Sequence, residues 1–172
     1  LLDAFPGVAQ ADHALRTITK CVEFLDHQWI PEKRNWKVSA EQDAPADSDG
    51  WAHGAAGILI ALDRVKKLTG TFSPTAELAL QRLRDRPLMQ WDHLSMGNCG
   101  LIDMWLLLGE PQTAGHLASR MLQRHQSQLS WAIPGGESMQ PGMMTGMAGI
   151  GYTLLRLEQP DRLPSLLVLD KE

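Results

Sequence analysis

The sequence has few cysteines and few features of β structure, and its apolar runs are short. Only Cys21 and Cys99 occur in 172 residues, without a C-x-x-C pair. No disulfide framework is therefore expected, and a reducing, cytoplasmic location fits. Apolar runs such as residues 104–108 are too short to cross a bilayer, and the first residues have no signal-peptide pattern. Few valines and no sustained apolar–polar alternation argue against a β fold.

Charge is also modest. The formal net charge is -4, and like charges do not gather in blocks. This argues against nucleic acid or an anionic membrane surface as the main partner. The length suits one domain with a real core.

Helical periodicity dominates the remaining pattern. Apolar residues from Leu15 to Trp29 follow a 3-4 spacing, which predicts a helix over residues 11–29 that Pro31 ends. We expect a polar loop at 30–50 and a C-terminal tail at 160–172. Further helices are expected at residues 55–68, 75–86, 99–108, 111–124 and 147–157. The sequence thus predicts an all-α fold.

Three helices open on the same pattern, G-x-x-G followed by an aliphatic residue. The stretches are "WAHGAAGIL", "HLSMGNCGL" and "MMTGMAGIG", whose first glycines are Gly54, Gly97 and Gly146. Spacings of 43 and 49 residues, with two helices per unit, indicate an array of helical hairpins. We expect the glycines to allow unusual backbone angles and to leave helix N–H groups uncovered toward a common centre. The alternative is that they only permit tight packing.

These stretches resemble the cyclase domain of lanthionine synthetases, in particular the C-terminal part of the class II (LanM-type) enzymes. That family has W-C-H-G-x-x-G-I, L-C-H-G-N-x-G and P-G-L-M-T-G-x-A-G-I-G-Y stretches in this order. This chain has "WAHGAAGI", "LSMGNCGL" and "QPGMMTGMAGIGY", and "PEKRNW" matches a loop upstream. The resemblance implies an α/α toroid with its active site at the centre.

The resemblance also implies a zinc site that this chain has lost. In the family, the two motif cysteines and the histidine after the second bind zinc, which activates a substrate thiol. Here Ala52, Ser95 and Met96 occupy those positions. Alanine has no donor, a serine hydroxyl ionises too weakly, and a thioether suits Cu(I) better than Zn(II). We therefore expect no zinc and no other cofactor.

A relocated zinc site made from His53, His93 and Cys99 is disfavoured, because Cys99 would point along its helix. His53 matches a family histidine and is a candidate general acid or base; it could equally bond a neighbouring backbone. Asp92 could orient a histidine or be a surface carboxylate. Arg156 is expected in a surface pair with Tyr152. At the centre of the ring, the expected substrate-binding residues are Trp51, Gly54, Gly97, Asn98 and Gly146.

Length suggests a half-ring. At about 46 residues per unit, 172 residues hold fewer than four hairpins, which is less than a closed toroid of this family needs. Either the chain is a fragment of a longer synthetase or a second subunit completes it. The expected partners are a precursor peptide and the rest of the synthetase, including the missing hairpins and a dehydratase domain.

Two functions follow. The first is thioether ring formation in a ribosomally made peptide, by addition of cysteine to dehydroamino acids without the family's zinc. The second is an inactive pseudo-cyclase that binds a precursor peptide or scaffolds a dehydratase domain. A carbohydrate-active toroid would need paired acids, and nothing in the sequence pairs its only candidates, Asp92, Asp103 and Glu137.

Overall fold

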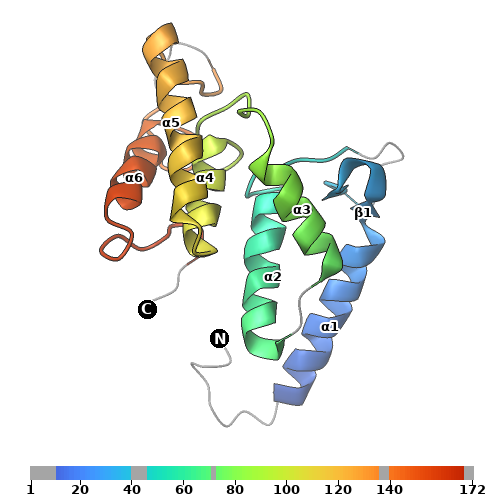
Figure 1. The fold of residues 1–172 in the computed structure, drawn as a ribbon. Helices are drawn as coiled ribbons and strands as arrows, with labels where there is room; N and C mark the ends of the chain where they lie inside the picture. Colours follow the sequence, from blue (N-terminus) through green and yellow to red (C-terminus); the bar gives the residue numbers. More distant parts are fainter. Residues whose placement is uncertain (1–10, 40–45, 71–72, 136–139, 169–172) are drawn as a thin grey trace.

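Helices form nearly all the regular structure in the described part of the chain, which a computed structural model gives as residues 11–39, 46–70, 73–135 and 140–168. The all-α prediction is confirmed. The helices are α1 (Ala11–His27), α2 (Ala55–Thr69), α3 (Pro74–Arg84), α4 (Asn98–Leu107), α5 (Pro111–Gln128) and α6 (Met147–Glu158) (Figure 1). None of the helices described is long and apolar enough to cross a membrane.

The helix boundaries have local causes. Proline stands in the first turn of α3 and α5, where its missing N–H removes no helical hydrogen bond. Gly70 follows α2 in the left-handed conformation, with φ of 73°, and its N–H donates to the carbonyl of Lys66. These signals explain why the predicted helices and the observed ones agree to within a few residues.

The region after α1 differs from the prediction. The first helix ends at His27, and Trp29–Ile30 (β1) pairs antiparallel with Asn35–Trp36 (β2) across a short 3-10 turn, Pro31–Lys33. The expected polar loop at 30–50 therefore contains a small β-hairpin. Its second strand is deeply buried: Asn35 is 0% and Trp36 1% exposed. Two buried residues in a polar stretch give no period from which sequence analysis could detect them.

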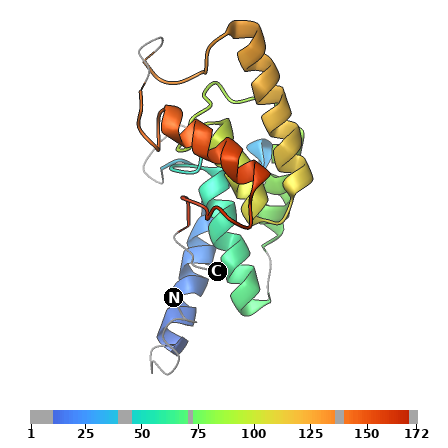
Figure 2. The same ribbon diagram turned by 90° about the vertical axis from the view of Figure 1, so that its left-hand side faces the viewer.

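Helix α4 lies at the centre of the fold. All residues from Asn98 to Trp105 are buried, because α4 packs against α2, α5 and α6. The helices opened by the glycine pairs, α2, α4 and α6, lie side by side with α4 in the middle, while α3 and α5 each connect two of them. In both views α1 and α5 lie at opposite ends of the molecule (Figures 1 and 2). This arrangement is part of an α/α toroid.

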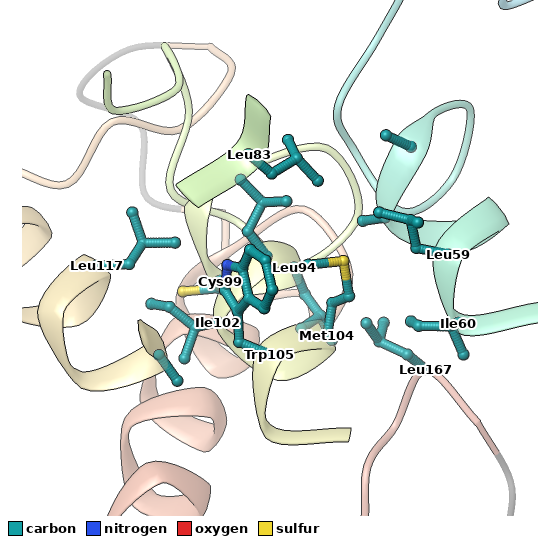
Figure 3. Close-up of a cluster of buried hydrophobic side chains, with 14 of the residues drawn as sticks. Leu59, Ile60, Leu83, Leu94, Cys99, Ile102, Met104, Trp105, Leu117 and Leu167 are labelled. Carbon is teal, nitrogen blue, oxygen red and sulfur yellow. The ribbon is translucent and has the colours of Figure 1, made fainter. Parts of the chain in front are cut away.

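The core surrounds α4. Figure 3 shows Met104 and Trp105 of α4 near side chains from α2, α3, α5 and the C-terminal segment. Burying each large apolar side chain of this kind contributes about 1.5–3 kcal/mol. The residues labelled there are Leu59, Ile60, Leu83, Leu94, Cys99, Ile102, Met104, Trp105, Leu117 and Leu167.

A buried ion pair fixes the C-terminal segment. Arg156 of α6 donates to Asp103 of α4 at 2.6 Å, and the Ser165 hydroxyl donates to the other carboxylate oxygen. Arg156 is 6% and Asp103 2% exposed, so the predicted surface pair of Arg156 with Tyr152 is wrong. Tyr152 donates instead to the carbonyl of Pro164. Burial raises the pKa of Asp103, and Ser165 and Arg156 oppose that shift.

Candidate functional site

Three entry loops meet in the structure, each leading into a helix that a glycine pair opens. They are the first entry loop (residues 48–54), the second (91–97) and the third (140–146). The N–H of Ala52 donates to the carbonyl of Ser95 at 3.0 Å, and the N–H of Ser95 donates to the carbonyl of Met144 at 2.8 Å. These three residues occupy the same position of their loops, two before the first glycine. Equivalent positions of the three loops are therefore joined by backbone hydrogen bonds.

Each entry loop folds back over its own helix. The first helical N–H donates to a carbonyl seven residues earlier, as from Ala55 to Ser48 at 2.9 Å and from Met147 to Gln140 at 2.7 Å. The N–H of Asn98 donates in the same way to Trp91 at 2.9 Å, and the second N–H of each helix repeats the pattern. The expectation of uncovered N–H groups is therefore wrong for the first two positions of each helix.

Glycine is required at these pairs because a side chain would have no space, and not because of the backbone angles. The first glycines have φ of -162°, -127° and -133°, an extended conformation open to any residue. At the second glycine of each pair a Cβ would clash with the carbonyl oxygen six residues earlier. These carbonyls belong to Trp51 for Gly57, Leu94 for Gly100 and Met143 for Gly149. The expectation of unusual backbone angles is therefore wrong. The second glycines are needed because the backbone of the entry loop lies against the helix.

Buried aspartates anchor the first two loops to the following helices. Asp92 is 1% exposed and forms an ion pair with Arg124 of α5. It also accepts hydrogen bonds from the Asn98 amide at 2.8 Å and the Ala132 N–H at 3.0 Å. Asp92 is thus neither a surface carboxylate nor hydrogen-bonded to a histidine.

The first loop repeats this anchor. Asp49 forms ion pairs with Arg82, at the end of α3, and with Arg86, whose guanidinium lies 2.7 Å from the carboxylate. Asp49 also accepts a hydrogen bond from the Asn35 amide at 3.1 Å. Asp49 and Asp92 each stand five residues before the first glycine of their pair. This D-x-x-x-x-G spacing was visible in the sequence, and it could have identified both anchors.

Among the expected substrate-binding residues, the three glycines and Asn98 are all buried. The Asn98 side chain accepts from the N–H of Met89 at 2.8 Å and donates to the carbonyl of Trp91 at 3.0 Å. Its polar atoms are bonded to the second loop and to Met89 just before it, so its geometry supports a role in shaping that loop.

His93 connects the second and third loops. The residue is 3% exposed, its ring Nδ1 accepts the N–H of Met96 at 3.3 Å, and the ring also bonds the backbone of Met144. Burial lowers the pKa of His93, against weaker opposing contributions from the Met144 bond and Asp92. A neutral ring with one acceptor and one donor nitrogen suits these two partners.

The candidates for a relocated metal site do not assemble. Cys99 is 0% exposed, burial raises the pKa of its thiol, and its Sγ lies 3.9 Å from the sulfur of Met121 in the core. His53, in contrast, is exposed. Within the described ranges no three His, Cys, Asp or Glu side chains are placed to hold a metal ion.

The three positions at which the resemblance implies zinc ligands lie together in the structure. The backbones of Ala52 and Ser95 are hydrogen-bonded, Met96 follows directly, and all three residues are half-buried. A methyl group, a hydroxyl and a thioether do not provide the thiolate or imidazole donors that zinc needs. The residues at these positions therefore do not fit the ion.

Two open grooves flank this meeting point. The first has a volume of about 590 Å³ and contains Trp51, Ala52 and the exposed His53 together with residues of α1 such as Phe24. The second, about 440 Å³, is lined by Ser95 and Met96 and by residues of the neighbouring segments. The remaining residues of the second groove are Asp47, Ser48, Met89, Gln90, Trp91, His93, Pro134 and Thr145.

The fold and the site define a class: an all-α domain of repeated helical hairpins in which glycine-paired entry loops converge between two grooves. The sequence model of the family described as lanthionine synthetase C-like protein matches residues 1–168. The chain therefore belongs to the lanthionine synthetase C-like family, as the motifs predicted. A search of curated proteins gave no match.

Proposed function

We propose that this chain is the cyclase-like part of a class II (LanM-type) lanthionine synthetase and that it acts in thioether ring formation without the family's zinc. The observation that carries the proposal is the hydrogen bond between the backbones of Ala52 and Ser95. It supports an intact site geometry whose metal donors have been replaced. The expected ligand is a ribosomally made precursor peptide in the grooves beside His53 and Met96.

The chemistry available to the chain rests on His53. In ring closure a cysteine sulfur bonds to the β-carbon of a dehydroamino acid, and the π electrons form an enolate that takes a proton at the α-carbon. A histidine can accept the thiol proton and return it to that carbon, so the proton balance closes without another reactant. The exposed ring of His53, in a groove with the indole of Trp51, is accessible to a bound peptide.

The test is ring closure of a dehydrated peptide that carries a free cysteine, followed by mass spectrometry with a thiol-alkylating agent and with a metal chelator present. We expect closure faster than in the absence of protein, and loss of most of that gain in His53→Ala. His13→Ala, which changes an exposed histidine of α1, is the matched control. Closure at the uncatalysed rate would refute the enzymatic proposal.

The second candidate is an inactive pseudo-cyclase that binds the peptide or scaffolds a dehydratase domain. It is favoured by the loss of every donor at positions 52, 95 and 96, while buried anchors such as Asp49 and Asp92 remain. Peptide binding in the micromolar range without ring closure would support this function. Binding that survives His53→Ala but not Trp51→Ala would locate the peptide in the first groove.

The partners follow from the same proposal. We propose that further hairpins, supplied by the rest of a synthetase or by another subunit, complete the ring, and that the protein acts in the cytoplasm. Copurification of the chain with a dehydratase domain, analysed by size-exclusion chromatography, tests this assembly.

A further inference from the structure

A cavity separate from the two grooves lies away from the entry loops, between the end of α3 and helix α5. Its volume is about 170 Å³. Leu83, Trp105 and Leu117 form its apolar side, and all three belong to the core in Figure 3. The other side is basic, since Arg84, Arg86, Arg120 and His116 line it. Neither the proposed ring chemistry nor the entry loops use the cavity itself.

The guanidinium groups here outnumber the carboxylates that pair with them. Arg84 pairs with Glu110. Among the residues that the structure describes, Arg86 forms an ion pair with Asp49 alone, and Asp49 also pairs with Arg82. Arg120 donates to the carbonyl of Arg86 at 3.2 Å, and in the described ranges it has no carboxylate within ion-pair distance.

Arg86 is the most confined of these cations. Its side chain is 17% exposed, and its Nε is buried without a hydrogen-bond partner among the residues described. Burial lowers the pKa of Arg86; the carboxylates of Asp49 and Asp47 oppose this shift, and the neighbouring charges of Arg82 and Arg120 add to it. A buried donor without a partner costs free energy, and the basic side chains that line the cavity would interact favourably with a bound anion.

We propose that this cavity binds a phosphate group. Guanidinium forks match the oxygens of a tetrahedral dianion, which accepts several charge-assisted hydrogen bonds at once. Arg120 and His116 are exposed and can close around the group, while Arg86 contacts it from the buried side. Inorganic phosphate and a phosphate ester share this chemistry, and the aromatic and aliphatic side of the cavity suits the organic part of an ester.

The experiment is a calorimetric titration of the whole protein with inorganic phosphate and, separately, with phosphoserine, both at constant ionic strength adjusted with chloride. We expect saturable one-to-one binding and a rise of several degrees in the midpoint of thermal unfolding. Tighter binding of phosphoserine identifies an ester as the ligand. Equal or tighter binding of inorganic phosphate identifies the free ion.

Variants locate the site. Arg120→Gln is expected to weaken binding about tenfold or more, the effect of losing one charge-assisted pair. His116→Asn is a second surface change that should weaken binding without affecting the fold. Arg162→Gln, at an exposed arginine after α6, is the matched control and should bind as the unchanged protein does. Absence of binding for both ligands, or equal affinity in Arg120→Gln and Arg162→Gln, would overturn the proposal.

Discussion

The second and third entry loops reach the same backbone geometry by different means. The second loop is anchored to α5 by the buried pair of Asp92 and Arg124. The third loop has Pro141 in the position of Asp92, and its backbone carbonyl at Met144 is bonded to Ser95 of the second loop. Because Ala52 of the first loop also bonds to Ser95, the second loop is hydrogen-bonded to both of the others. The second loop is therefore the central loop of the site, and the buried ion pair between Asp92 and Arg124 holds it against α5.

The largest effect should come from introducing the zinc donors that the resemblance implies, all of which belong to the first two loops. We expect the triple variant Ala52→Cys, Ser95→Cys, Met96→His to bind zinc with an apparent free energy near 10 kcal/mol, at the low end for protein zinc sites. The reason is that the backbones of residues 52 and 95 are already in contact. Metal content after dialysis, with a thiol reductant present, measures this.

The control for this experiment keeps Ser95 and changes only the other two positions, which leaves two donors and weak binding. A triple variant that retains no more zinc than the unchanged protein would show that the loops do not converge as described.

Removing the anchor of the second loop should have the next largest effect. Asp92→Ala leaves the Arg124 guanidinium largely buried without its partner, and we expect a loss of about 3–5 kcal/mol in the free energy of unfolding. Urea denaturation measures the loss. Asp161→Ala changes an exposed carboxylate after α6 and should alter stability by less than about 0.5 kcal/mol. Equal effects of the two substitutions would contradict the role of Asp92 as an anchor.

A smaller effect is expected in the third loop, where close packing replaces the ion pair. Gly149→Ala places a methyl group against the carbonyl of Met143, and overpacking of this kind costs about 1–3 kcal/mol. Gly151→Ala lies in the same helix, and no atom lies within 4 Å of its Cβ position. It should stabilise α6 by about 0.5–1 kcal/mol. Thermal unfolding of both variants gives the comparison, and a shift of the same sign in both would rule out this packing explanation.

The smallest effect concerns pH and the bond between the second and third loops. The pKa of His93 is lowered in the folded protein from its usual 6.5, so the unfolded chain binds the proton more readily. Its contribution to stability is therefore fully present above about pH 6.5 and is lost as the pH falls through the folded pKa. Urea unfolding between pH 8 and pH 5 should show the decline.

Asp103 titrates with the opposite sign, because burial raises its pKa. The measurement is therefore the difference between the unchanged protein and His93→Asn, a variant that keeps a hydrogen-bond acceptor near Nδ1 but cannot be protonated. A pH dependence identical in the two proteins would exclude His93 as its source.

The sequence predicted the helices because their signals are local. The apolar periodicity from which they were predicted acts within a few residues, and so do the residues that bound the helices in the structure, Pro74, Pro111 and Gly70. The burial of Arg156 was missed, since its partner Asp103 lies 53 positions earlier and no periodicity relates the two residues. Long-range pairing of this kind is set by packing rather than by local propensity.

The candidate site was predicted in part for the same reason. The motifs around Gly54 and Gly97 identified the residues that come together, but not how their backbone groups would be used. Carbonyls of Ser48 and Trp91 accept the helix N–H groups that the sequence analysis left free. That bonding depends on the path of the loop, which glycine content alone does not reveal.

The entry loops are joined to one another through main-chain hydrogen bonds at Ala52, Ser95 and Met144, and this has a consequence for how such a protein can change. Among the described residues, the side chains of Ala52, Ser95 and Met96 take no part in the backbone hydrogen bonds that join the loops or in the buried ion pairs. Their replacement therefore leaves the architecture intact. Different side chains at these three positions are compatible with the same supporting backbone.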